Sequence, residues 1–148
     1  MAQTFETEIE RLLYETLTGD DALATLLGAD EMDPRVYLSW RTKECPLISD
    51  SKPGYVMIRL DSADQPQRVG GTVDDWRERY LVSLFSLPEK RELRREVVDR
   101  FRTLFHRQSF VTESFLVYDT VEIAREERAT DDRIVELMYT LSIRFLPR

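Results

Sequence analysis

A short apolar segment followed at once by a long amphipathic one limits what this chain can form. Residues 79–85 read Arg-Tyr-Leu-Val-Ser-Leu-Phe, which predicts a strand buried over much of both faces. A helix start is predicted at residues 86–89, because Ser86 precedes Glu89 by three positions and Pro88 falls in the first turn. Apolar side chains then recur at helical spacing, at Leu93, Val97, Phe101, Leu104 and Phe105. A sheet covered by this helix is therefore expected at the centre of the fold.

The opposite face of this helix is charged and is predicted to lie in water. It carries Arg91, Glu92, Arg94, Arg95, Glu96, Asp99, Arg100 and Arg102. Arg95 and Asp99, like Glu96 and Arg100, have the i, i+4 spacing of ion pairs. We therefore interpret the arginines as a self-paired, solvated face and not as a nucleic-acid surface.

The other segments complete an α+β domain. Helices are expected over residues 5–17 and 22–27, ended by Gly19 and Gly28, and strands over residues 35–40, 55–60, 115–123 and 135–145. In residues 115–123, Phe115, Val117, Val121 and Ile123 are expected to share the buried face. The last strand alternates most clearly, with Val135, Leu137, Tyr139, Leu141, Ile143 and Phe145 at every second position. The order ααβββαββ predicts one domain over residues 1–148, with a mainly antiparallel sheet of about five strands and helices on one face.

Three connecting segments lack a core pattern. Residues 41–54 and 124–133 are expected to be a loop and a charged turn. Residues 61–75 form the longest such stretch and predict a protruding loop or hairpin, with Gly70-Gly71 at its tip. Long loops of this kind in compact domains are usually functional or mobile.

Composition excludes several classes of function. The 148 residues carry a formal charge of −7, which argues against a protein that grips phosphates by bulk electrostatics. Cys45 has no partner for an internal disulfide, and His106 stands at a helix end, where a cationic histidine is favoured. With one histidine, one cysteine and no catalytic motif, we expect no enzyme, no cofactor and no metal site. The aspartates at 61, 64, 74, 75, 131 and 132 are interpreted as a solvated rim. No apolar window is long enough for a membrane span, and the first residues lack the apolar region of a secretion signal.

Four short motifs follow one another along the chain. They are Asp21–Gly28 leading to Arg35-Val36-Tyr37; Pro53-Gly54-Tyr55-Val56-Met57-Ile58; Leu84-Phe85-Ser86 before the charged helix; and Arg128…Asp132 before the alternating strand. In this order, over about residues 8–146, they resemble the tail-completion, or tail-terminator, proteins of long-tailed bacteriophages, which also occur in prophages and gene-transfer particles. Phe85 stands where that family commonly has Trp, and its approach to the second strand is shorter than here.

The resemblance implies a structural role without catalysis. Such proteins form a ring, typically a hexamer, on the last ring of tail-tube protein, stop tube growth and offer a surface to the head-completion (stopper) protein. DNA passes through the channel without specific binding, and the charge of −7 suggests an acidic lumen to which DNA would not adhere. The expected location is the virion tail or neck, after assembly in the host cytoplasm.

Contacts with ring or tube neighbours are predicted in residues 41–53 and 61–76. The candidate interface residues are Trp40, Arg68, Val69, Gly70, Gly71 and Trp76. Free strand edges at residues 36–40 or 135–145 are expected to extend the sheet between subunits. Two other functions stay open: a stopper or adaptor connector between head and tail, and a cytoplasmic α+β ligand-binding or regulatory domain with a deep apolar pocket.

Overall fold

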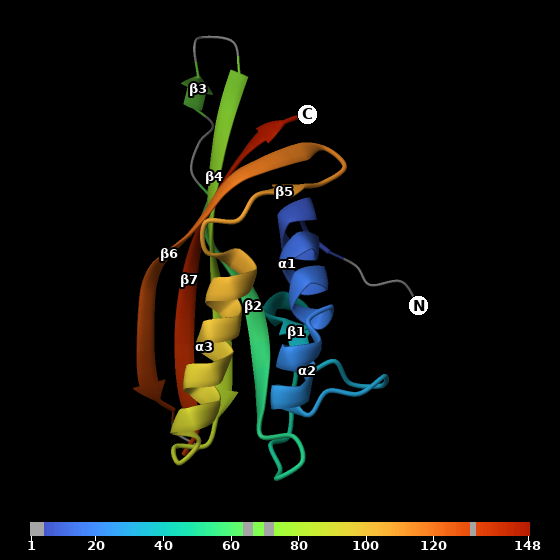
Figure 1. Cartoon of the computed structure of the whole chain (residues 1–148), viewed down its shortest axis with the longest axis vertical. Helices are drawn as coiled ribbons and strands as arrows, with labels where there is room; N and C mark the ends of the chain where they lie inside the picture. The colour runs from blue at the N-terminus through green and yellow to red at the C-terminus, as the bar shows by residue number, and fades with distance from the viewer. Residues whose placement is uncertain (1–4, 64–66, 70–72, 131–132) are drawn as a thin grey trace.

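The computed structural model describes residues 5–63, 67–69, 73–130 and 133–148 (Figure 1). In chain order its elements are α1 (Glu8–Thr18), α2 (Asp21–Leu27), β1 (Val36–Leu38), the 3₁₀ turn η1 (Ser39–Arg41), β2 (Gly54–Ala63), β3 (Gln67–Val69), β4 (Val73–Ser86), α3 (Arg91–Phe105), β5 (Phe110–Val111), β6 (Phe115–Ala129) and β7 (Val135–Pro147). The α+β class and the helices on one face of the sheet are confirmed. The short strands β3 and β5 were not predicted.

The strands form a seven-stranded sheet in the order β1-β2-β4-β7-β6-β5, with β3 pairing β4 off this path. Only β1 and β2 run parallel among the pairs that are described. Strand β7 is an inner strand, paired with β4 on one side and β6 on the other. The prediction of a free edge at residues 135–145 is therefore wrong, because alternation reports one buried face and says nothing about main-chain partners. Among the described strands, the open edges belong to β1, which pairs only with β2, to β5, which pairs only with β6, and to residues 123–129 of β6, which pair only with β7.

The hydrophobic core lies between the sheet and the three helices. The predicted apolar stripe of α3 is buried, with Leu93, Val97, Phe101 and Phe105 facing the sheet. Phe101 packs on Tyr139 of β7, with 5.4 Å between ring centroids. The predicted face of β7 is also confirmed, since Leu137, Tyr139, Leu141, Ile143 and Phe145 are all buried.

Strands occupy much of residues 61–75, for which a protruding loop or hairpin was predicted. Strand β2 continues to Ala63, β4 begins at Val73, and β3 pairs with residues 73–75 of β4. The resulting arm projects beyond the helices (Figure 1). A projecting hairpin is held by main-chain pairing and has little core to face, so it leaves no apolar pattern in the sequence. The predicted tip, Gly70-Gly71, lies outside the described residues.

Strand β6 also continues through residues predicted to form a turn. It runs to Ala129, and its register with β7 shifts between Val117 and Asp119 and between Glu122 and Ala124. Each bulge changes which side chains face the core. Thr120 is consequently buried, whereas Ile123 is 44% exposed, so the predicted face of residues 115–123 is wrong beyond Val117.

The start of α3 differs from the prediction as well. The helix begins at Arg91, and its N-cap residue Lys90 makes no side-chain capping bond. Arg94, predicted to be solvated, is only 5% exposed. Its guanidinium donates to the Ser86 hydroxyl at 3.1 Å and to the carbonyls of Leu87 and Pro88 at 2.8 and 3.0 Å. Arg94 therefore holds the turn that Ser86 was expected to cap.

The ion pairs of α3 also join different partners from those predicted. Arg95 pairs with Glu92, and Arg100 reaches Asp20 at the start of α2. The Asp20 carboxylate accepts from Arg100 at 2.9 and 2.7 Å and caps α2 by accepting from the Leu23 N–H at 3.0 Å. The bond to Arg100 is the main cause that lowers the pKa of Asp20. One carboxylate therefore joins α2 to α3.

Replacing Asp20 with Asn is expected to lower the free energy of unfolding at pH 7 by roughly 1 kcal/mol, because Asn keeps the cap but loses the ion pair. Since the pKa of Asp20 is lowered in the folded state, its stabilisation is present above the unfolded pKa of about 3.9 and is lost as pH falls through the folded pKa. The difference from wild type should therefore shrink between pH 7 and pH 3 in urea unfolding. The neighbouring exposed Asp21→Asn is the control, and a difference that stays constant with pH would contradict the assignment.

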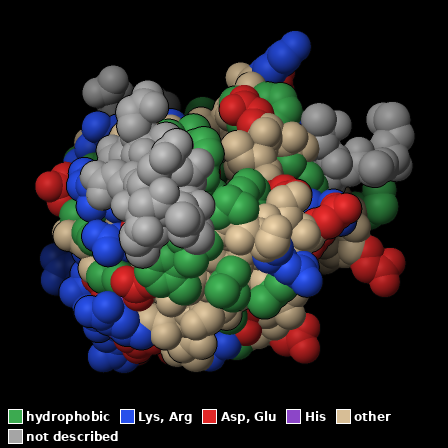
Figure 2. Space-filling model, turned by 90° about the horizontal axis from the view of Figure 1, so that it is seen from above, with side chains coloured by type: hydrophobic (Ala, Val, Ile, Leu, Met, Phe, Trp, Pro, Cys, Tyr) green, Lys and Arg blue, Asp and Glu red, His purple; other side chains and the backbone are tan. Residues whose placement is uncertain are grey.

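Exposed hydrophobic side chains occur near the root of the hairpin arm. Leu60, Val111, Leu116 and Tyr118 are each at least 37% exposed. Figure 2 views the molecule from this end and shows hydrophobic side chains gathered in the middle of it. They give this end of the molecule a partly apolar surface.

Candidate assembly surfaces

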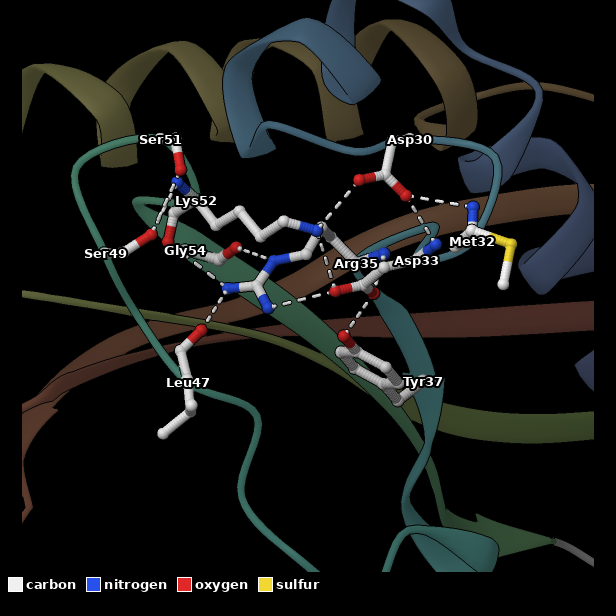
Figure 3. A network of polar contacts seen from close by, with 10 residues as sticks. All are labelled: Asp30, Met32, Asp33, Arg35, Tyr37, Leu47, Ser49, Ser51, Lys52 and Gly54. Atoms are coloured by element: carbon white, nitrogen blue, oxygen red, sulfur yellow. Dashed lines mark hydrogen bonds and ion pairs between the residues drawn. The ribbon is translucent and has the colours of Figure 1, made fainter.

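A buried arginine organises the end of the sheet at which β1 begins. Arg35 is 2% exposed and has a positive φ of 58°. Its Nε donates to the Gly54 carbonyl at 3.0 Å, and its Nη2 donates to the carbonyls of Leu47 and Lys52 at 2.9 and 3.3 Å (Figure 3). The guanidinium also lies 5.7 Å from the centroid of the Tyr55 ring. Arg35 therefore fixes the predicted contact loop, residues 41–53, to the sheet.

Asp33 completes this network on the side of the α2–β1 loop. It accepts from the Arg35 N–H at 3.1 Å and forms an ion pair with the Arg35 guanidinium at 3.5 Å. The Tyr37 hydroxyl donates to Asp33 at 2.5 Å, and burial, followed by this contact, raises the pKa of Tyr37 to about 12. Lys52 Nζ bridges Asp33 and Asp30 at 3.2 and 3.1 Å. Two loops distant in sequence are thus held as one unit.

Gly28 packs tightly against the same unit. It ends α2 in the left-handed conformation, with φ of 69°. A Cβ atom at this position would lie 1.9 Å from the Ser51 carbonyl oxygen. Only glycine fits both the conformation and the approach.

The sequence patterns did not single out Arg35 as a buried anchor. It appeared only within the Arg35-Val36-Tyr37 motif of the family resemblance. Its main acceptors are backbone carbonyls 12–19 residues away, and these leave no side-chain signal. The one local feature that could have indicated a buried Arg35 is Asp33, an acidic residue two positions before it.

Trp40, a predicted interface residue, lies on η1 and is tied to α1. Its indole Nε1 donates to both oxygens of Glu10 at 3.1 and 3.0 Å. Glu10 is 2% exposed and also accepts from the Glu6 N–H at 3.0 Å. The ring of Trp40 remains 46% exposed, so it is a fixed, partly apolar surface feature.

Trp40→Phe is expected to lower the free energy of unfolding by about 1.5–3 kcal/mol, because the buried Glu10 carboxylate loses its indole donor. The cost should be smaller in a Glu10→Gln background, where the remaining group is neutral. Chemical denaturation of the wild type, the two single variants and the double variant measures the coupling free energy between Trp40 and Glu10. Equal costs in both backgrounds would show that the contact contributes nothing.

Three further predicted interface residues are described, and they lie on or near the hairpin arm. Trp76 of β4 stacks on Phe145 of β7, with centroids 6.3 Å apart, and sits at the edge of the core. Arg68 and Val69 belong to β3, opposite residues 74 and 73 of β4. Gly70 and Gly71 lie outside the described residues. The four described interface candidates therefore lie in two separate regions, and their role in contacts remains a prediction.

His106 and Cys45 have ordinary local surroundings. His106 caps α3, and its Nδ1 accepts from the Glu122 N–H at 3.2 Å. Cys45 is exposed. In the described part of the chain, no group of acidic, histidine or cysteine side chains is arranged to hold a metal ion, and no helix has the length and apolarity needed to cross a membrane.

A surface hollow of about 300 Å³ lies between α1 and the β5–β6 turn. Its lining includes Glu8, Arg11, Glu15 and Glu113. Glu8 is occupied in bonds to Ser114 and Thr112, and Arg11 is paired with Glu15. This lining differs from the apolar pocket expected of a ligand-binding domain, whereas a second surface hollow of about 230 Å³ is lined mainly by apolar side chains, among them Leu17, Leu23 and Leu27.

Comparison with known proteins identifies a fold relative. No protein-family model matches the chain, and no curated protein matches it. A solved structure described as the virion of a native gene transfer agent particle contains a chain with a similar fold, at a TM-score of 0.68 and 15% identity. The match covers 90% of this chain and 91% of that one. The two chains therefore share a fold over nearly their whole lengths.

Proposed function

We propose that this chain is a structural protein of a phage-like virion. The observation that carries the proposal is the fold shared, over 90% of the chain, with a component of a gene transfer agent virion. The sequence motifs that resemble tail-terminator proteins support the same assignment independently of that comparison. Under this proposal the chain catalyses no reaction and holds no cofactor, and it acts in the virion after assembly in the host cytoplasm.

In the finer form of the proposal, the chain forms a ring, typically a hexamer, on the end of the tail tube. The ring ends tube polymerisation and offers a surface to the head-completion protein, while DNA passes through its channel. Two open sheet edges, at β1 and at residues 123–129 of β6, support a head-to-tail arrangement of copies. The network around Arg35 supports a rigid role for the loops that contact neighbours.

Electron microscopy of the purified chain mixed with tail tubes tests this function. We expect ring-shaped density on one end of each tube. The fold comparison supports an alternative function equally well: a connector at the neck of the virion, whose partner would be the portal or an adaptor. Capture of the portal alone, with tube protein absent from the complex, would reject the terminator role in favour of that connector.

A further inference from the structure

Two glutamates are buried beside the start of α1, and they differ in what they contact. Glu10 is 2% exposed, and its carboxylate accepts from the indole Nε1 of Trp40 and from the Glu6 N–H. Glu78 of β4 is 9% exposed, and its only hydrogen bond within the described residues comes from the Tyr80 hydroxyl, which donates to Oε2 at 3.3 Å. A buried carboxylate needs several donors to hold a charge at low cost. Glu10 has such donors, whereas Glu78 has one hydroxyl.

The Tyr80 hydroxyl also links Glu78 to α1. It bonds to the Thr7 hydroxyl at 2.9 Å, and Thr7 caps α1 by accepting from the Glu10 N–H at 3.0 Å. Glu78 belongs to the last described pair of β2 with β4, opposite Ala63, where the hairpin arm leaves the sheet. The side chains of Glu78, Tyr80 and Thr7 therefore join the first turn of α1 to the root of the arm.

The groups around Glu78 supply no compensating positive charge among the residues that are described. Opposite it lie Ala63 of β2 and Ile143 of β7, neither of which ionises. Arg77 and Arg79 flank it along β4 and point to the other face of the sheet. The other ionisable side chains near this end of β2, β4 and α1 are Asp61, Tyr80, Glu6, Glu8, Glu10 and Arg11. Arg11, the one base among them, pairs with Glu15 at 2.9 Å.

Protonation of Glu78 changes the direction of these hydrogen bonds. Burial is the main cause that raises the pKa of Glu78, and the bond from Tyr80 opposes it. Burial also raises the pKa of Tyr80, so the phenol keeps its hydrogen. A protonated Glu78 can donate to Tyr80, which then donates to Thr7. An ionised Glu78 receives a single phenol hydrogen, so water must reach the carboxylate to stabilise its charge.

We propose that Glu78 forms a pH-sensitive contact between the start of α1 and the root of the arm, tight when its carboxyl holds a proton and loosened when it ionises. The contact lies within one copy of the chain and does not depend on the proposed function. Because the pKa of Glu78 is raised in the folded state, the stabilisation by its protonated form is complete below the ordinary value of about 4.3 and is lost as pH rises through the folded pKa. The first turn of α1 is then expected to open more often, while the sheet stays folded.

Hydrogen exchange at the Glu10 amide, measured by NMR, tests this contact because that N–H donates to Thr7. After correction for the intrinsic exchange rate, its protection in the wild type should fall by about threefold or more between about pH 5 and pH 8. Glu78→Gln keeps the size of the side chain and a donor for Tyr80 but carries no charge, so its protection should stay nearly constant over this range. Glu6→Gln, at an exposed neighbouring acid, should behave like the wild type.

Titration of the Glu78 carboxyl carbon in the wild type, also by NMR, gives a second measurement that needs no variant. It should titrate at higher pH than the carboxyl of the exposed Glu6, and the loss of protection at Glu10 should follow the same curve. Titration of Glu78 together with Glu6 would overturn the proposal. The same pH dependence of Glu10 exchange in the wild type and in Glu78→Gln would overturn it as well.

Discussion

Arg35→Met is expected to lower the free energy of unfolding by roughly 3–5 kcal/mol, because the variant leaves buried acceptors without their donor. The three carbonyls that lose a bond belong to Leu47, Lys52 and Gly54. Asp33 also loses its guanidinium partner. Methionine approximates the apolar stem of arginine, so the loss reports the hydrogen bonds more than the packing. Urea unfolding followed by circular dichroism measures it.

The matched control for Arg35 is Arg91→Met, at the exposed first residue of α3. Surface substitutions of this kind usually change stability by no more than about 0.5 kcal/mol. If Arg35→Met also stayed within about 1 kcal/mol of the wild type, water would be replacing the arginine at low cost. The α2–β1 loop and residues 41–53 would then be held together without depending on Arg35.

Gly28→Ala is expected to be nearly as damaging, with a loss of at least about 3 kcal/mol. An alanine in the left-handed region costs about 1–2 kcal/mol by itself. The new Cβ would lie 1.9 Å from the Ser51 carbonyl oxygen, so the turn at residues 49–52 must also move. Lys52 would move with that turn and weaken its bridge to Asp30, and we therefore expect increased hydrogen exchange at Met32 and Asp33 as well as a lower melting temperature.

Gly19→Ala provides the comparison for this prediction. Gly19 also ends a helix, but its φ of −82° suits any residue, and its new Cβ would approach Glu15 O only to 3.0 Å. Its cost should stay near 1 kcal/mol or below, because the strain at Gly28 is absent. Equal costs at both glycines would remove the argument for a close approach at Gly28.

Side-chain periodicity predicted the parts of this fold that face a core. The stripe of α3 and the alternation of β7 were both correct, because burial imposes those patterns on the sequence. The arm of β2 and β4 was predicted only as a loop or hairpin, and the strand at the end of β6 was missed, since main-chain pairing holds these strands and they face mostly water. The bulges in β6 then moved Thr120 into the core, which no period-two pattern anticipates.

The candidate surfaces were predictable only in part. Trp40 was identified as a candidate from its position beside a loop, but its anchor, Glu10, is 30 residues away and looks like any helix acid. Arg35 appeared only as the first residue of a predicted strand, because its acceptors are backbone carbonyls that leave no pattern in the sequence.

The length of tail tubes made without this chain tests the central claim most directly. Particles are produced from a phage-like element with its gene deleted, and tubes are measured by electron microscopy beside the complemented strain. We predict over-long tubes of variable length and heads without tails, with normal length and joining restored by the wild-type chain. Tubes of normal length attached to heads in the deletion strain would contradict the claim that this chain ends the tail.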